Sequence, residues 1–217
     1  MARPKEGYRI GATKIPSVTT VISRFKDPAA LLYWSNTQGL EGKTLQEARE
    51  SAMSAGTLAH QIIEARLTKQ PEPDLEAIDS AIVEPAFQGV AAYDRWADAH
   101  QLEVLVTEEP MVSEKHAFGG TPDVIGKVSG RIAIVDWKTS KGGSAYVDHL
   151  IQLCAYAILV EECIGLVPVE GHVLILGRED ASFHHHSWIL ESLADARESF
   201  LLMRRLYDLD RVLKRKV

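Results

Sequence analysis

Cysteine is scarce in this sequence, which contains only Cys154 and Cys163 among its 217 residues. Two thiols are too few for a framework of disulfide bonds, and too few for a metal site built from four cysteines. The chain cannot by itself supply the four thiolates that hold an iron–sulfur cluster, so we expect no such cofactor. Because nothing in its cysteine content requires an oxidising compartment, we expect a cytoplasmic location.

Long apolar runs, linkers and repeats are also missing. No run approaches the roughly 20 apolar residues that a membrane-spanning helix needs, and residues 1–14 lack the apolar stretch of a secretory signal. We therefore expect no membrane partner. Without linkers or repeats to mark a boundary, we predict a single domain over 1–217. It has a mainly helical part at 1–100, then a sheet core and a C-terminal helix at 101–217.

An excess of positive charge is absent too. Lys and Arg together number 24 against 30 Asp and Glu, which gives a net charge of −6. This balance argues against broad electrostatic wrapping of a nucleic acid, although it leaves room for a local basic groove beside an acidic site. The chain also has no GxxxxGK[ST] phosphate-binding loop, so any ATP-driven motor that works with it must be another chain.

The most informative stretch is a predicted β-hairpin. Two runs rich in Val and Ile, 122–128 and 131–138, are separated by Ser129-Gly130. If these two residues form the turn, Asp123 lies directly opposite Asp136, with Cβ atoms about 4.5–5.5 Å apart. Gly126 could mark a bulge that shifts this register by one residue.

Charged side chains meet at the end of this hairpin. Lys138 is two residues beyond Asp136 and so projects from the same face of the strand. The preceding residues 132–135 are apolar on both faces, which is typical of a strand covered on both sides. Opposed carboxylates at the end of a buried strand are costly unless a cation lies between them. The pattern favours a metal-binding site over the alternative, a surface hairpin with solvated charges.

Along the whole chain, the apolar patterns predict helices first and strands later. Ser17 is expected to cap a short helix, and Asp27-Pro28 to open a second helix that ends near Gly39. Further helices are predicted at 44–69, at 74–100 with an interruption or a kink near Pro85, at 146–164 and at 191–217. Strands are predicted at 103–107, 168–176 and 182–190. This order indicates an α/β fold, a mixed central β-sheet flanked by helices with an N-terminal helical elaboration.

These motifs resemble those of a known family. Pro122-Asp123 followed by Asp136-Trp137-Lys138 resembles the PD-(D/E)XK nuclease signature. Together with Gln152-x-x-x-Tyr156, the pattern is similar to the RecB-type branch of that superfamily, which includes the mitochondrial genome-maintenance exonuclease and phage-encoded relatives. The resemblance implies a restriction-endonuclease-like core, and for a phage-encoded chain the host cytoplasm as the location.

The resemblance also suggests a metal ligand on a helix. Residues 56–60 match the family's Gly-Thr-x-x-His element, which implies that His60 binds a metal ion. A lone helical histidine is otherwise more often structural or exposed. An imidazole suits Mn²⁺ somewhat better than Mg²⁺, which prefers oxygen ligands. We therefore expect one or two ions of Mg²⁺ or Mn²⁺.

Further ligands follow from the family pattern. An ungapped alignment places Glu108 at an acidic position of the family. Glu109 remains an alternative ligand, because a shift of one residue in the register exchanges the two faces of a strand. Asp123, Asp136 and the carbonyl oxygen of Trp137 would complete the set.

The remaining predicted roles concern catalysis and DNA contact. Lys138 would orient or help deprotonate the attacking water and stabilise charge on the phosphate. Gln152 and Tyr156 share one face of a helix, and the resemblance implies that they orient the substrate or the lysine. Thr139 and Ser140 could position a phosphate.

Two aromatic residues suggest contact with unpaired bases. Tyr33 and Trp34 could stack on single-stranded DNA, although packing between helices is the more common role of such side chains. A run of three histidines, His184-His185-His186, lies in a predicted strand. Alternation splits its side chains between two faces, which favours exposed histidines on an edge strand over a metal site.

Together these features predict a metal-dependent exonuclease. It would prefer single-stranded or free-ended DNA and act in replication, recombination or repair, where a protein of those processes could be its partner. The alternatives are a structure-specific endonuclease of the same superfamily and a cleavage-inactive DNA-binding or assembly protein. Cleavage polarity cannot be derived from these residues.

Overall fold

The computed structural model describes residues 4, 6–26, 29–40, 42 and 54–216. The predicted helix start at Asp27-Pro28 lies outside these residues, as does the segment 44–53 of the predicted helix 44–69. The side chain of Trp34 is also outside the described part of the structure, so its predicted contact with DNA stays a prediction.

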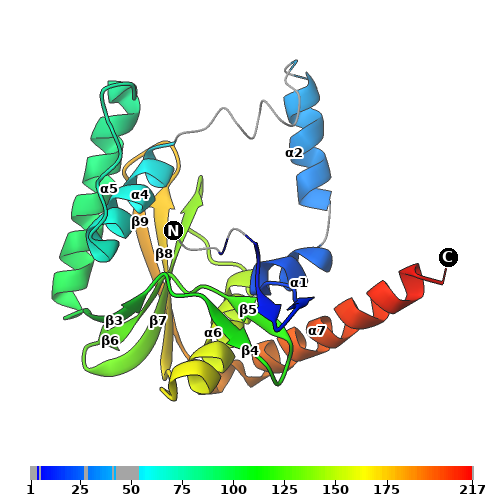
Figure 1. Cartoon of the computed structure of the whole chain (residues 1–217). Coiled ribbons are helices and arrows are strands. Elements are labelled where there is room, and N and C mark those ends of the chain that lie inside the picture. The colour runs from blue at the N-terminus through cyan, green and yellow to red at the C-terminus, as the bar shows by residue number, and fades with distance from the viewer. Residues whose placement is uncertain (1–3, 5, 27–28, 41, 43–53, 217) are drawn as a thin grey trace.

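A five-stranded mixed sheet forms the centre of the protein, and it confirms the predicted fold class (Figure 1). Its spatial order is β3-β6-β7-β8-β9, with β7 and β8 parallel and the other neighbours antiparallel. The strands are β3 (Glu103–Thr107), β6 (Val124–Val128), β7 (Arg131–Ser140), β8 (Glu170–Gly177) and β9 (Phe183–Ile189).

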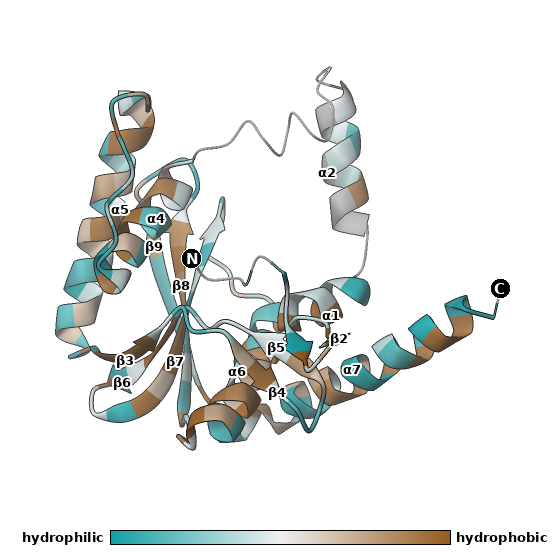
Figure 2. Ribbon diagram, in the orientation of Figure 1, coloured by the Kyte–Doolittle hydropathy of each residue, from teal (hydrophilic) through white to brown (hydrophobic). Residues whose placement is uncertain are grey.

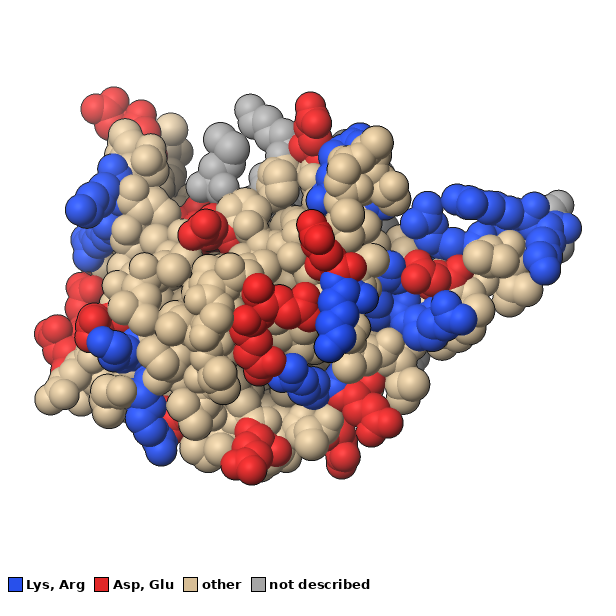
Figure 3. All heavy atoms as spheres, turned by 60° about the horizontal axis from the view of Figure 1, so that its bottom comes forward, with Lys and Arg blue, Asp and Glu red and all other residues tan. Residues whose placement is uncertain are grey.

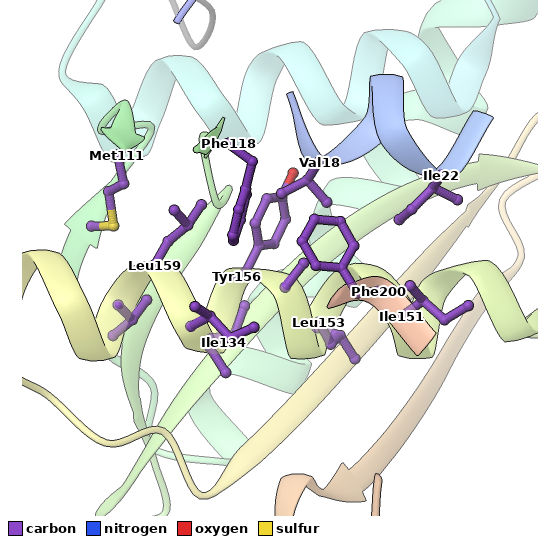
Figure 4. Packing of buried hydrophobic residues seen from close by; sticks show 14 of the residues in the cluster. Val18, Ile22, Met111, Phe118, Ile134, Ile151, Leu153, Tyr156, Leu159 and Phe200 are labelled. Atoms are coloured by element: carbon purple, nitrogen blue, oxygen red, sulfur yellow. The ribbon is translucent and has the colours of Figure 1, made fainter. Parts of the chain in front are cut away.

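Helices cover both faces of this sheet (Figure 1). One face is covered by α4 (Ala55–Thr68) and α5 (Ser80–Ala99), and the other by α1 (Val18–Arg24), α6 (Val147–Ile164) and α7 (Ala194–Lys214). Strand β7 contributes to both cores, because Ala133 and Val135 pack on the α4–α5 side and Ile134 packs on the α6 side (Figure 4). Burial on both faces therefore confirms the interpretation of residues 132–135.

The β6–β7 hairpin has the register that the turn residues predict. Val128 pairs with Arg131, and the pairing continues without a shift to Val124 and Val135. Ser129 and Gly130 both have positive φ, 49° and 81°, which fits the two-residue turns that favour tight hairpins. The irregularity near Gly126 lies on the other side of the strand, in its pairing with β3, so it leaves the hairpin register unchanged.

Side-chain caps decide where two helices begin, and both starts differ from the predictions. Ser54 has extended backbone and its hydroxyl accepts a hydrogen bond of 3.2 Å from the amide of Thr57, so α4 begins at Ala55 rather than continuing from residue 44. Asp79 caps α5, since its carboxylate accepts a hydrogen bond of 2.9 Å from the amide of Ala81. Pro85 lies inside α5 and does not interrupt it.

Two short ribbons were not predicted, and they bring the N-terminal segment to the sheet. They are β1 (Arg9–Ile10) with β2 (Thr13–Lys14), and β4 (Met111–Ser113) with β5 (Phe118–Gly120). Gly119 of β5 forms a bridge with Ser17, and a Cβ atom at Gly119 would overlap the ring of Tyr8. This close approach places Tyr8 and Ser17 next to the start of β6.

The remaining helices lie outside the sheet layers. Helix α2 (Ala29–Leu40) stands apart from the sheet, a 3-10 turn spans Leu190–Leu193, and the C-terminal part of α7 projects from the body of the protein with alternating apolar and polar surface (Figure 2). Within the part of the chain that the structure describes, none of the helices combines the length and the apolar character needed to span a bilayer.

Candidate active site

Two carboxylates meet where the hairpin opens. Val124 pairs with Val135, so Asp123 comes directly before β6 and next to Asp136 of β7. The backbone amide of Trp137 donates a hydrogen bond of 2.8 Å to Oδ2 of Asp123. Burial raises the pKa of Asp123 well above its ordinary value, and the charge of Asp136 raises it further. Asp123 and Asp136 therefore lie side by side, as the sequence predicted. Repulsion between their charges is unfavourable, and a bound cation would relieve it.

Asp136 is held by groups on its own strand and on α6. It is only 2% exposed, and it forms an ion pair with Lys138. Nε2 of Gln152 donates to Oδ1 of Asp136 at 3.3 Å and to the hydroxyl of Tyr156 at 2.9 Å. Burial raises the pKa of Tyr156 well above its usual range, so its hydroxyl stays protonated. The structure thus brings the predicted Lys, Gln and Tyr to the same carboxylate.

Asp123 and two further residues form a potential metal-binding set. His60, Glu108 and Asp123 each offer a ligand atom, and these atoms all lie within 4.8 Å of one another. They come from α4, from the loop after β3 and from the start of β6, so residues distant in sequence converge at one point. Asp136 is outside this set among the described residues, and its ligand role stays a prediction.

Glu108 is the acidic residue that faces the site. Its backbone is left-handed, with φ of 53°, a conformation that few residues other than glycine adopt. Glu108 is buried and its Oε2 atom has no hydrogen-bond partner among the described residues, whereas Glu109 is exposed. Burial, and then the charge of Glu64, raise the pKa of Glu108 to about 7. An orphaned buried carboxyl oxygen beside an imidazole and a second carboxylate fits a divalent cation.

His60 is positioned by the close packing of α4 on the sheet. Gly56, one turn earlier, lies so near the end of β8 that an added Cβ atom would be 2.6 Å from the carbonyl oxygen of Gly177. The imidazole of His60 stacks on Trp137, with ring centroids 6.0 Å apart. Burial lowers the pKa of His60, which favours the neutral ring that binds metals.

A cleft of about 330 Å³ lies at the site, and Glu108 is not among the residues that line it. It is lined by most of the predicted residues and by Gly120 and Thr121, which directly precede Pro122-Asp123 in the family motif. Four further lining residues had no predicted place in the site, namely Tyr8, Ser17, Val18 and Thr19. The hydroxyl groups of Tyr8 and Thr121 are 2.7 Å apart, a contact between residues far apart in sequence. The motif position of Thr121 next to Pro122-Asp123 indicated its place in the site, whereas no local pattern indicated that of Tyr8.

Other predicted residues lie outside the cleft. The methyl group of Thr139 approaches Gly56 on the opposite face of β7, and the hydroxyl of Ser140 accepts a hydrogen bond of 3.3 Å from the amide of Gly142. Tyr33 is 77% exposed on α2, so packing between helices is the wrong interpretation for this side chain. Contacts of Thr139, Ser140 and Tyr33 with DNA stay predictions.

The histidine triplet also differs in part from the prediction. His184 is exposed, as expected on the edge strand β9. His185 is half-buried, because its Nε2 atom lies 2.9 Å from Nδ1 of His172 and its ring packs against Trp96 of α5. The prediction that all three are exposed is wrong, since α5 covers this part of β9.

Comparison with known proteins identifies the family. A family model of the PD-(D/E)XK nuclease superfamily matches residues 19–182, which is more than half of the chain. The protein therefore belongs to the PD-(D/E)XK nuclease superfamily, as the spacing of Asp123, Asp136 and Lys138 indicated. Nucleases of this superfamily use divalent metal ions, and their substrate is DNA. A comparison with curated proteins finds no significant match.

One solved structure shares the fold at low sequence identity, and two others match more weakly. A candidate exonuclease from Eubacterium rectale is 13% identical, with a TM-score of 0.52, over 75% of this chain and 68% of that chain. An alkaline exonuclease from Laribacter hongkongensis is 15% identical, with a TM-score of 0.36, over 78% of this chain and 97% of that chain. The same enzyme in complex with dAMP is 17% identical, with a TM-score of 0.39, over 75% and 91%.

Proposed function

We propose that this protein is a divalent-metal-dependent exonuclease that hydrolyses phosphodiester bonds in single-stranded or free-ended DNA. The observation that carries the proposal is the convergence of two arrangements at one cleft. One is the set of ligand atoms from His60, Glu108 and Asp123, of which His60 and Asp123 line the cleft. The other is the ion pair between Lys138 and Asp136, which both line it. Ligands for a cation beside an ammonium group are what hydrolysis of a phosphodiester requires.

The metal site fits Mg²⁺ or Mn²⁺ because its donors are carboxylate oxygens and one neutral imidazole. His60, Glu108 and Asp123 would hold the ion, with Asp136 and the carbonyl of Trp137 as further candidates. When bound, such an ion neutralises charge on the scissile phosphate and lowers the pKa of a water molecule. Its binding would also offset the burial and the repulsion between carboxylates that together raise the pKa of Glu108 and of Asp123.

Lys138 supplies positive charge to the reacting phosphate. Its side chain is 25% exposed and lines the cleft, so its ammonium group is within reach of a substrate there. Asp136 fixes this group from one side, and Gln152 holds Asp136 in turn. We infer that the ammonium orients the attacking water, favours loss of its proton through its positive charge and offsets the charge that develops on the phosphate oxygens.

The size of the cleft favours a single strand that enters from a free end. Its volume of about 330 Å³ is at the lower end of the range for small-molecule sites, roughly 300–1,000 Å³, which suits one nucleotide better than an intact duplex. The N-terminal residues Tyr8, Ser17 and Thr19 line the cleft together with the catalytic residues. Free single strands of this kind arise in replication, recombination and repair, where we place the activity.

The mode of cleavage can be tested with linear and circular single-stranded DNA, each incubated with Mg²⁺ or Mn²⁺. Loss of linear DNA with release of short products, while circles persist, supports the exonuclease. Cut circles would instead identify an endonuclease of the same superfamily. Binding of DNA without cleavage of either form would identify a cleavage-inactive DNA-binding protein.

A further inference from the structure

A second cleft lies beside the catalytic cleft. Its volume is about 520 Å³, and two residues, Tyr8 and Ser17, line both clefts. The walls of the second cleft come from the N-terminal segment with its β1–β2 ribbon, from the start of α1 and from α7, so it lies outside the sheet that carries the carboxylates. None of the predicted metal ligands lines it.

The second cleft has positive charge that is not neutralised locally. Lys14 and Arg211 line it, and neither has an acidic partner among the described residues. Nearby cations differ in this respect, because Asp210 forms ion pairs of 2.6 Å with Arg24 and 3.2 Å with Lys214. Lys and Arg side chains gather on the projecting α7 although the net charge of the chain is −6 (Figure 3). Unpaired cations in a cleft attract phosphate groups.

The geometry of this cleft also suits a nucleotide. Gly7 has φ of 76°, and a Cβ atom at this position would be 3.0 Å from Cε of Lys14 and 3.6 Å from its Nζ. The absence of a side chain at Gly7 thus allows the lysine to lie along the wall of the cleft. Tyr207 contributes an aromatic ring, and the guanidinium of Arg204 lies 5.7 Å from the centre of that ring. Aromatic rings in basic clefts stack on unpaired bases.

We propose that the second cleft binds the single-stranded DNA that continues from the nucleotide in the catalytic cleft. The inference rests on the proposed function, since it assigns the path of that substrate. Because Tyr8 and Ser17 line both clefts, the clefts are adjacent, and a strand that leaves one cleft would pass these two residues to reach the other. Lys14 and Arg211 then contact backbone phosphate, and Tyr207 stacks on a base.

The test measures binding separately from cleavage. Fluorescence anisotropy with a labelled single-stranded oligonucleotide in EDTA compares wild type with Arg211→Glu, Lys14→Glu and the double variant. We expect each single variant to bind roughly three- to tenfold more weakly, and the dependence of log affinity on log salt to fall by about 0.7 for each phosphate that the variant no longer neutralises. Arg205→Glu is the matched control, because Arg205 is exposed on the same helix, lines neither cleft and changes the net charge equally.

A second readout uses a substrate that fills only the catalytic cleft. Hydrolysis of a nitrophenyl ester of thymidine monophosphate should proceed at the wild-type rate in Arg211→Glu, whereas degradation of a long single strand should slow. The inference is overturned if Arg211→Glu and Lys14→Glu bind the oligonucleotide like Arg205→Glu. Failure of the wild-type protein to hydrolyse the small ester would instead count against the proposed function, so the two failures can be told apart.

Discussion

The backbone amide of Trp137 donates a hydrogen bond of 2.8 Å to the carboxylate of Asp123. Trp137 lies between Asp136 and Lys138, so this contact ties the start of β6 to the part of β7 that carries the other two charges. The relative position of the three groups is therefore set by backbone pairing in a buried hairpin and not by flexible side chains. Such pre-organisation is what a catalytic site requires.

Replacing Lys138 with Ala should abolish most cleavage while DNA binding persists. The substitution removes the ammonium that pairs with Asp136 and lines the cleft. Removing one preorganised electrostatic interaction with a reacting phosphate costs about 10²–10³-fold in turnover. Initial rates on a labelled single strand, with anisotropy in EDTA for binding, measure both effects. Turnover that stays near the wild-type value would refute the role of this lysine.

Replacing Glu108 with Gln should reduce the thermal stabilisation that the protein gains when it binds a divalent metal ion. Wild type should melt at a higher temperature with Mn²⁺ or Mg²⁺, since a ligand at 100 times its Kd stabilises the folded state by about 2.7 kcal/mol. The variant should gain much less from the metal. Without metal it should be at least as stable as wild type, because a neutral amide replaces a buried carboxyl group crowded by Glu64.

The exposed neighbour provides the matched control. Glu109→Gln removes the same charge one residue away, outside the metal-binding set, and should keep the full metal response in a thermal melt. Equal loss of the metal response in both variants would show that the effect is one of net charge and not of coordination by Glu108.

The hairpin and its acids were predictable from the sequence for a physical reason. A two-residue turn at Ser129-Gly130 fixes the register, so counting residues from the turn places Asp123 beside Asp136. Glu108 could be aligned but not chosen over Glu109, because its orientation depends on a left-handed backbone that glutamate rarely adopts.

Contacts between distant segments could not be predicted in the same way. Tyr8 reaches the cleft through its hydroxyl contact with Thr121 and through the close approach of Gly119, and neither contact leaves a local pattern in the sequence. Helix α4 begins at Ala55 because Ser54 caps it. The periodic apolar pattern, considered alone, gave no sign of this cap and so predicted an earlier start. Local pairing was therefore predictable, whereas the docking of the N-terminal segment was not.

Replacing Gly56 with Ala should destabilise the protein and weaken the site. The new Cβ atom would be 2.6 Å from the carbonyl oxygen of Gly177 and 2.7 Å from Cγ2 of Thr139, so α4 must shift, and with it His60. Overpacking of this kind costs about 1–3 kcal/mol, part of which is offset by the better helix propensity of alanine. Urea unfolding measures the change in free energy.

A second helical glycine is the control for this substitution. A Cβ atom at Gly89 of α5 would meet Cβ of Ala59 at 3.5 Å, an ordinary contact, so Gly89→Ala should be neutral or stabilising by up to about 1 kcal/mol. If the two variants unfold at the same urea concentration, close packing at Gly56 does not constrain α4.

Acid should destabilise the fold through the histidines under α5. Burial, followed by the charges of neighbouring histidines, lowers the pKa of His172 and of His185 to about 4, below the usual 6.5. Between these two values the unfolded chain binds more protons than the folded chain, so stability rises with pH. The contribution is fully present above pH 6.5 and is lost as the pH falls towards 4.

The melting temperature as a function of pH measures this linkage. His185→Gln should flatten the dependence between pH 4 and 6.5, because one of the two titrating rings is removed. His184→Gln, which changes the exposed neighbour on the same strand, should keep the wild-type slope. The account of this cluster is wrong if both variants have the same slope.

The most direct test of the central claim is cleavage of end-labelled single-stranded DNA by wild type and Asp123→Asn. Each protein is assayed with Mg²⁺, with Mn²⁺ and with EDTA. The account predicts degradation only by wild type and only with a divalent ion, since Asp123 belongs to the metal-binding set and borders the lysine that faces the phosphate. Degradation in EDTA, or undiminished degradation by Asp123→Asn, would contradict it.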